Sequence, residues 1–180
     1  MSKIKKPRTS IQRITVLALL LATEIVFARF LSISMPIVRI GFAFLPLALA
    51  AYLYGPVGGM IVGGLGDFIG ATLFPTSGSA YFPGFTATAI LTGFCFGLFL
   101  HKQLNLKRII FAVLTTQIIC GLLLNSLWLS IITGTPYIKV FLFRIIQVSI
   151  LIAVEIIILP ITFKYLQNLE KSGIYFKIVH

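Results

Sequence analysis

Long apolar runs alternate along the chain with short breaks that contain charged residues, proline or glycine. The longer runs have roughly the 20 residues that an α-helix needs to cross a bilayer. The stretch 40–73 is too long for one crossing, and Gly55 and Pro56 interrupt it near the middle, so the pattern predicts two helices joined by a tight turn. We therefore expect an all-α membrane protein, a single domain over residues 1–180, with six transmembrane helices at 14–31, 40–54, 56–73, 84–100, 109–132 and 138–163.

The overall composition excludes a soluble globular domain. Hydrophobic residues make up 58% of the 180 residues and charged residues only 11%, with a mean hydropathy of +1.05, which is more apolar surface than one soluble core could bury. Fifteen Lys and Arg against four Asp and Glu give a net charge of +11. In a soluble protein this charge would indicate a nucleic-acid partner; here we interpret it as a marker of membrane topology and expect no nucleic acid.

The positions of the cations predict which side of the membrane each loop occupies. Basic residues are enriched in cytoplasmic segments, and an even number of helices places both termini on one side. With both termini cytoplasmic, 11 of the 15 cations face inward, namely Lys3, Lys5, Lys6, Arg8, Arg13, Lys102, Lys107, Arg108, Lys164, Lys171 and Lys177. An odd number of helices would put the C-terminal lysines outside, so the charge pattern favours six.

Four charged residues fall inside apolar runs: Glu24, Asp67, Arg144 and Glu155. A charge at mid-bilayer costs about 2.5 to 3.5 kcal/mol on insertion scales, so each of these residues needs a partner or a function. The carboxylates could form ion pairs that tie helices together, as Glu24 could with an arginine, or they could take part in a site.

The cations outside the cytoplasmic group suggest a ligand. Arg29, Arg39, Lys139 and Arg144 all lie in the outer half or the outer loops, where no carboxylate of the outer loops balances them. Arginine matches a carboxylate with two parallel hydrogen bonds, so these residues would suit a ligand that carries carboxylates. The alternative for Arg29 and Arg39 is that they extend to lipid headgroups.

Aromatic residues cluster around the connection that follows the third predicted helix. Phe74, Tyr81, Phe82 and Phe85 stand within twelve residues. Their rings could stack on a flat heterocycle, or they could form an interfacial belt at the level of the lipid headgroups.

Two polar pairs share helix faces farther along the chain. Asn125 and Trp128 are i and i+3 neighbours, as are Arg144 and Gln147. Asn125 lies roughly 12 Å from the outer end of its helix, where a polar side chain should face protein or a cavity. Either ligand binding or a hydrogen bond between helices would satisfy it.

No catalytic motif is present in the sequence. It contains no Walker A motif, no HExxH and no Cys-His cluster, and its two histidines have no candidate nucleophile beside them. We expect neither an enzyme nor a bound cofactor or metal. Ala18 and Ala22, four residues apart on the first helix, would instead allow a close approach to another helix in lipid.

Several longer segments resemble one transporter family. RIGFAFLPLALAAYLYGP, GDFIGATLFP and YFPGFTATAILTGFCFGLFL, together with Asn125 and Trp128, are similar to the folate-specific S components of energy-coupling factor (ECF) transporters. The resemblance spans nearly the whole chain and is strongest from Arg39 to Leu100. It implies the S-component fold in a bacterial cytoplasmic membrane.

The resemblance also implies a function without chemistry. An S component captures one vitamin from outside, under loops that join helices 1 to 2, 3 to 4 and 5 to 6. It docks on a transmembrane T component that two ATPases drive, and Ala18 and Ala22 match the docking motif of the family. Folate has a flat pterin for stacking and a glutamate tail with two carboxylates.

These features assign provisional roles to individual residues. We expect Phe74, Tyr81, Phe82 and Gly84 in the capping loop, Asn125 and Trp128 at the pterin, and Arg29, Arg39 and Arg144 as charge partners of the ligand, with Asp67 as a weaker candidate that could instead pair helices. The alternatives are an S component for another vitamin, such as riboflavin or pantothenate, and a membrane scaffold or assembly protein with a lipid-filled groove.

Overall fold

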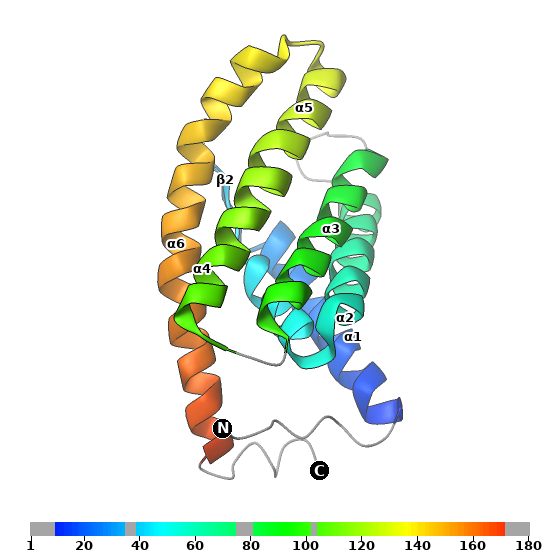
Figure 1. The fold of residues 1–180 in the computed structure, drawn as a ribbon. Coiled ribbons are helices and arrows are strands. Elements are labelled where there is room, and N and C mark those ends of the chain that lie inside the picture. Colours follow the sequence, from blue (N-terminus) through cyan, green and yellow to red (C-terminus); the bar gives the residue numbers. More distant parts are fainter. Residues whose placement is uncertain (1–9, 35–38, 75–80, 102–103, 172–180) are drawn as a thin grey trace.

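The helices run roughly along one long axis and form a bundle (Figure 1). The computed structural model describes residues 10–34, 39–74, 81–101 and 104–171. Within these ranges, five helical segments are long and apolar enough to cross a membrane: Ile11–Arg29, Phe44–Leu73, Pro83–Leu100, Leu106–Thr133 and Tyr137–Asn168. The prediction of an all-α protein built from long apolar helices is confirmed.

The second of these segments, α2 (Phe44–Leu73), is folded back on itself at Gly55. Gly55 has φ 76° and ψ −164°, a backbone conformation that only glycine adopts without strain. Pro56 then starts the second arm, where its missing N–H costs nothing. A Cβ atom on Gly63 would lie 3.1 Å from Leu47 Cδ1, although a straight helix would separate these residues by about 24 Å. The predicted break is therefore present, and residues 44–54 and 56–73 form two antiparallel arms.

The second arm of α2 packs against α3 (Pro83–Leu100) with backbone touching backbone. A Cβ atom on Gly93 would collide with the carbonyl group of Gly59, and one on Gly97 would collide with the backbone of Pro56. Small residues allow this approach because they have no bulky side chains, and the close packing stabilises helices in lipid. The buried apolar core continues from this contact, with Phe44, Ala48, Val62, Phe96, Leu100, Ala112, Val113 and Leu159 among its members.

A long helix with a π-helical centre follows α3. It consists of α4 (Leu106–Thr115), the π-helix η1 (Thr116–Leu124) and α5 (Asn125–Thr133). The sequence pattern predicts one regular helix over 109–132, and the structure adds the π-helix, a rare form that often occurs at functional sites. Gly134, with φ 65°, ends α5 in the left-handed conformation that commonly closes helices.

The other ends differ modestly from the predicted boundaries. Helix α1 begins earlier, over Ser10–Arg29, and α6 is longer, over Tyr137–Lys171, because the helical backbone continues into polar sequence beyond the apolar run. The break after α1 adds a minor feature to this all-α fold. Two-residue strands, β1 (Ile33–Ser34) and β2 (Arg39–Ile40), pair antiparallel in the break after α1, with Ile33 opposite Ile40.

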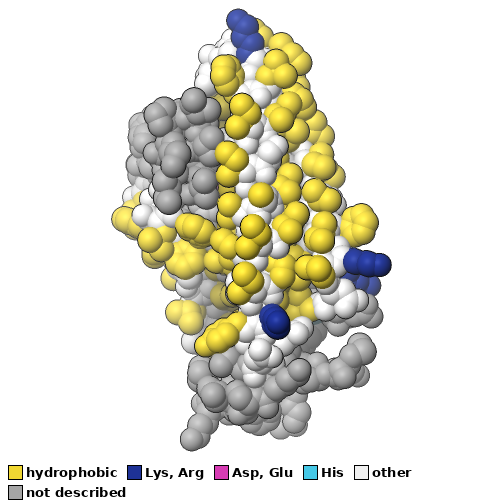
Figure 2. Space-filling model, turned by 90° about the vertical axis from the view of Figure 1, so that its left-hand side faces the viewer, with side chains coloured by type: hydrophobic (Ala, Val, Ile, Leu, Met, Phe, Trp, Pro, Cys, Tyr) yellow, Lys and Arg dark blue, Asp and Glu magenta, His cyan; other side chains and the backbone are white. Residues whose placement is uncertain are grey.

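The two ends of the bundle hold different connections. The start of α1, the end of α3, the start of α4 and the end of α6 lie toward the bottom of Figure 1, whereas α5 turns into α6 at the top. Figure 2 shows the face covered by α6, where hydrophobic side chains run along the length of the helix. Exposed apolar residues on α6 include Ile138, Leu142, Phe143, Ile146, Ile157 and Ile161. Such a surface suits contact with lipid rather than water.

Candidate ligand-binding site

A cavity of about 820 Å³ lies inside the bundle, and its lining extends from Ile132 and Arg144, near the turn between α5 and α6, to Thr116 and Glu155. Helices α1, α2 and α3, the π-helix η1, α5 and α6 all contribute to its wall. Its polar lining consists of Glu24, Arg29, Asp67, Tyr81, Thr88, Thr92, Thr116, Gln117, Asn125, Arg144, Gln147 and Glu155, and its aromatic lining of Phe44, Phe82, Phe85 and Phe96. This volume falls within the range of about 300–1,000 Å³ typical of small-molecule sites.

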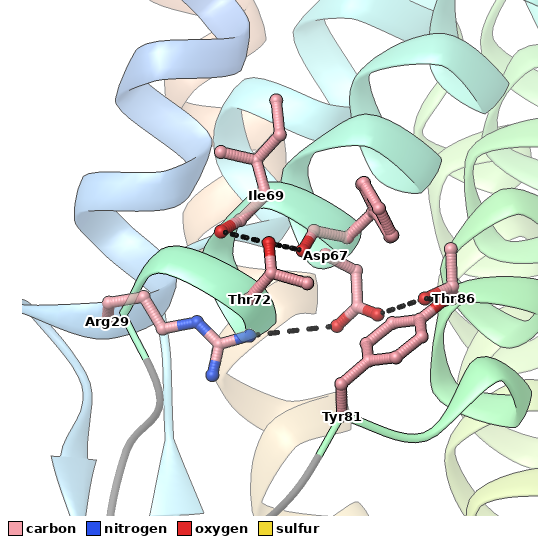
Figure 3. Close-up of polar contacts among 7 residues, drawn as sticks. Arg29, Asp67, Ile69, Thr72, Tyr81 and Thr86 are labelled. Atoms are coloured by element: carbon pink, nitrogen blue, oxygen red, sulfur yellow. Dashed lines mark hydrogen bonds and ion pairs between the residues drawn. The ribbon is translucent and has the colours of Figure 1, made fainter.

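On one side of the cavity, a polar network joins α1, α2 and α3 (Figure 3). Arg29 Nη2 lies 3.9 Å from Asp67 Oδ1, and Thr86 Oγ1 donates a hydrogen bond of 2.7 Å to Asp67 Oδ2. The hydroxyl of Tyr81 lies 3.2 Å from Thr86 Oγ1. Asp67 therefore pairs helices, as one reading of the sequence proposed, and it also lines the cavity.

Glycines on α2 make room for the charged side chains of α1. A Cβ atom on Gly66 would collide with the carboxylate of Glu24, which is only 7% exposed. A Cβ atom on Gly70 would lie 2.9 Å from Arg29 Nε. The spacing of small residues along α2 thus allows Glu24 and Arg29 to lie between the helices, beside the cavity.

An aromatic wall stands between α3 and α5. The ring of Phe82 lies 5.8 Å from that of Trp128 and 6.0 Å from that of Phe85, measured between centroids. Trp128 Nε1 donates a hydrogen bond of 2.9 Å to Thr88 Oγ1. A Cβ atom on Gly84 would lie 2.5 Å from Phe82 Cε1 and 2.6 Å from Trp128 Cδ2, so Gly84 lets the two rings close over the start of α3.

Helix α6 supplies the opposite wall through one of its faces. Arg144, Gln147 and Glu155 all line the cavity, and Arg144 and Glu155 are about 16 Å apart along the helix. Arg144 Nε donates a hydrogen bond of 3.2 Å to the carbonyl oxygen of Gly121, and Gln117 Nε2 donates one to Glu155 Oε1. The cavity therefore has a cationic end at Arg144 and a carboxylate end at Glu155.

The structure brings together most of the residues that the sequence predicts for a site. Six of them line the cavity, namely Arg29, Asp67, Tyr81, Phe82, Asn125 and Arg144. Gly84 and Trp128 lie directly behind this lining and pack on Phe82.

The remaining predicted residues lie elsewhere. Phe74 packs on Phe30, with ring centroids 5.7 Å apart, and is not part of the cavity wall. Lys139 is exposed and does not line the cavity. Arg39 belongs to β2, and its side chain lies outside the described part of the chain. Ala18 and Ala22, the predicted docking residues, are exposed on α1.

Among the cavity residues that sequence reasoning left out of the predicted site are Glu24, Gln117 and Glu155. The signal for the two glutamates was present, since each is a lone acid in an apolar run. Gln117 gave a weaker signal of the same kind, as an amide within a hydrophobic helix. Within the described ranges, no three His, Cys, Asp or Glu side chains gather in a way that could hold a metal ion.

A ligand-sized polar cavity inside helices with apolar outer faces defines a membrane-embedded binding protein. Residues 12–165 match the family described as "ECF transporter, substrate-specific component". The chain therefore belongs to this family of substrate-binding transporter subunits, and it is a multi-pass membrane protein rather than an enzyme.

Individual relatives agree with this family. The chain is 37% identical over 155 residues to a protein named "Folate transporter FolT" from Clostridium novyi (strain NT), covering 86% of this chain and 89% of the relative. A protein of the same name from Leuconostoc mesenteroides is 32% identical over 133 residues, covering 73% and 70% of the two chains.

Solved structures show the same arrangement of helices. A structure described as "Crystal structure of FolT bound with folic acid" superposes with a TM-score of 0.74 at 30% identity, covering 83% of this chain and 89% of the other. A second, described as an S component of a bacterial ECF transporter, gives a TM-score of 0.61 at 22% identity over 88% of this chain and 99% of the other, and supports the fold alone.

Proposed function

We propose that this protein is the folate-binding S subunit of an ECF-type transporter in a bacterial cytoplasmic membrane. The observation that carries the proposal is the cavity, in which arginines, aromatic rings and polar side chains surround a space of ligand size. The relatives named as folate transporters and the likeness to a structure with folic acid support the same ligand.

The chemistry of folate matches the lining residue by residue. Phe82 and Phe85 offer ring faces and edges to a flat ring of folate, which has both a pterin and a benzoyl ring. Asn125 Oδ1 is buried and has no hydrogen-bond partner among the described residues, so a ligand N–H group would satisfy it. Arg29 and Arg144 can each hold a carboxylate of the glutamate tail.

Other predicted residues have supporting roles in this proposal. Trp128 and Gly84 hold the aromatic wall against the ligand, and Tyr81 caps the site near Asp67. Phe74 and Arg39 belong to the connections that follow α2 and α1, and in this proposal they would contribute to binding from those connections. Asp67 keeps Arg29 next to the ligand and remains a weaker candidate for direct contact.

We propose six membrane-embedded helices with both termini in the cytoplasm, counting the two arms of α2 separately. The start of α1 and the end of α6 lie at the same end of the bundle, as an even count requires (Figure 1). Lys107, Arg108 and Lys164 belong to the helix ends on that side. The first arm, 44–54, is only about 16 Å long, and its burial inside the bundle, at Phe44 and Leu47 among others, compensates for its short span.

Equilibrium binding tests the proposed ligand. The purified protein should bind folate roughly 100-fold more tightly than riboflavin or pantothenate, measured by calorimetry or by quenching of the single tryptophan. Preferential binding of riboflavin or pantothenate would assign an S component for another vitamin. The absence of binding to all three vitamins at micromolar concentrations would exclude a vitamin-capture role and favour a scaffold.

The partners in this proposal are a transmembrane T component and two ATPases, docked through α1. Ala18 and Ala22 are exposed and lie on one face of that helix, where a second helix could approach closely. Ala18→Trp should leave folate binding unchanged while abolishing folate uptake and co-purification of the T component. The control is Ala153→Trp, which places the same side chain at an exposed alanine of α6 and should preserve uptake. Loss of folate binding in Ala18→Trp would contradict a docking role.

A further inference from the structure

Glu155 is a buried carboxyl group at the edge of the cavity with an unused oxygen atom. Its side chain is 2% exposed, and its Oε1 accepts a hydrogen bond from Gln117 Nε2. Its Oε2 is buried without a hydrogen-bond partner among the described residues, yet the residue lines the cavity. A buried acceptor of this kind is costly in a membrane-embedded helix unless a ligand completes its hydrogen bonding.

The local backbone holds Gln117 in place for this contact. Gln117 is the second residue of the π-helix η1, and Gly121 lies in the same element. A Cβ atom on Gly121 would lie 2.5 Å from Gln117 Oε1. The carboxamide of Gln117 therefore lies between Gly121 and Glu155, and it fixes one oxygen of the carboxyl group while the other remains available.

Glu155 differs from the other carboxylates of the cavity in its surroundings. Asp67 is paired with Arg29 and accepts a hydrogen bond from Thr86. Glu24 Oε2 is also buried without a hydrogen-bond partner among the described residues, but this oxygen packs tightly on Gly66 at the contact between α1 and α2. Glu155 lies on α6 about 16 Å along the helix from Arg144, and its described hydrogen-bond partner is a neutral amide.

We propose that Glu155, positioned by Gln117, contacts the donor edge of the ligand's flat head. This inference rests on the proposed function and names how the pterin is recognised. A pterin presents a ring N–H and an exocyclic amino group side by side. Oε2 accepts a hydrogen bond from one of them, and the second lone pair of Oε1, beside the bond from Gln117, accepts from the other. The pterin then lies at the Glu155 end of the cavity, and the glutamate tail extends toward Arg144.

This arrangement also supplies specificity. The ring edge of a flavin carries two carbonyl oxygens flanking one N–H. These carbonyl oxygens would face the carboxylate oxygens with no hydrogen atom between them. A site built to accept hydrogen bonds rejects ligands that lack the donors, because its own buried polar group stays unpaired. Glu155 therefore excludes flat heterocycles that have the right size but the wrong edge.

The test combines one substitution with one change in the ligand. Glu155→Gln keeps the shape and the hydrogen bond from Gln117 but replaces Oε2 with an amide that donates. Folate binding should weaken about 10- to 100-fold, as expected for loss of a charged hydrogen bond. The wild-type protein should lose a similar factor for a folate analogue without the exocyclic amino group. Glu155→Gln should weaken binding of that analogue less than it weakens binding of folate, because only the contact with the ring N–H remains to be lost.

Two further measurements separate ligand contact from a structural role. Pteroate, which lacks the glutamate tail, should lose as much affinity as folate in Glu155→Gln. Gln117→Leu should weaken folate binding by a smaller factor than Glu155→Gln does. The weakening caused by Gln117→Leu should also be smaller for the ligand without the amino group. Glu24→Gln is the matched control, because it makes the same chemical change at a buried glutamate of the opposite wall.

The outcomes distinguish this inference from the proposed function. Wild-type protein that binds no folate would overturn the proposed function itself. Wild-type protein that binds folate and the analogue without the exocyclic amino group equally well would overturn only the role of Glu155. This measurement involves no variant that could misfold. The role of Glu155 would also be overturned if Glu155→Gln weakened binding of folate and of the analogue without the amino group by the same factor. It would be overturned as well if Glu24→Gln, instead of Glu155→Gln, weakened binding of folate more than binding of the analogue.

Discussion

Two halves of the bundle are built on different principles. In the half formed by α2 and α3, half of the residues along the most apolar stretch of α2 are buried, and the helices meet through glycine backbones. In the half formed by η1, α5 and α6, only 17% of the residues along the most apolar stretch of α6 are buried, and polar side chains join the helices. The cavity lies between these halves.

This difference indicates that the first half supports the structure and the second half recognises the ligand. Helices in backbone contact cannot slide or rotate without steric collision, so α2 and α3 form a rigid frame. The other half contains the π-helix and three side chains, Asn125, Ser126 and Glu155, that each have a buried polar atom without a hydrogen-bond partner among the described residues. We therefore expect substitutions in the first half to affect stability and those in the second to affect ligand binding.

The largest effect is expected at the contact between α2 and α3. Gly93→Ala places a methyl group against the carbonyl of Gly59, which is backbone and cannot move aside. The free energy of unfolding should fall by about 2–3 kcal/mol, measured by thermal or detergent-induced unfolding. Gly64→Ala is the control on the same helix pair, because its methyl group would meet only the side chain of Ile90, which can change rotamer. Equal losses in both variants would contradict a special role for backbone contact.

The frame was largely predictable from the sequence, for a physical reason. Hydropathy marks where a chain lies in lipid, so the helix expected at 84–100 matches Pro83–Leu100 closely. The break at Gly55 and Pro56 was predictable because these residues have local backbone preferences. The π-helix was not, because TQIICGLLL has the apolar character of an ordinary transmembrane helix. Its extra residue per turn depends on contacts with other helices.

A smaller but still large effect is expected at the cationic end of the second half. Arg144→Ala should weaken folate binding about 10- to 100-fold, because one carboxylate of the tail loses a charged hydrogen-bond partner. The affinity for pteroate should change far less, and calorimetry with both ligands measures the difference. The unfolding temperature should change little, since the one hydrogen bond described for the Arg144 side chain is to the carbonyl oxygen of Gly121. Equal weakening of both ligands would place Arg144 at the pterin instead.

The site was only partly predictable. Arg29, Asn125 and Arg144 line the cavity as expected, because polar residues in apolar runs must face the interior of the bundle. The same rule identified Glu155 as costly but could not name its partner. The contact with Gln117 depends on how α6 and η1 are rotated relative to each other, and residue spacing within one helix carries no information about that rotation.

The smallest effect is expected at Gly84, where the two halves meet through the aromatic wall. Gly84→Ala adds a methyl group that would lie 2.5 Å from Phe82 and 2.6 Å from Trp128. Alanine favours the helix, so stability should hold, but the displaced rings should weaken folate binding by a factor of about 3 to 10. Gly41→Ala is the matched control, because Gly41 also lines the cavity and its methyl group would have 3.7 Å to the nearest neighbour, Ser32. If Gly84→Ala lowered stability as much as Gly93→Ala does, the aromatic wall would belong to the rigid frame, and the boundary between the two halves would lie farther toward α5.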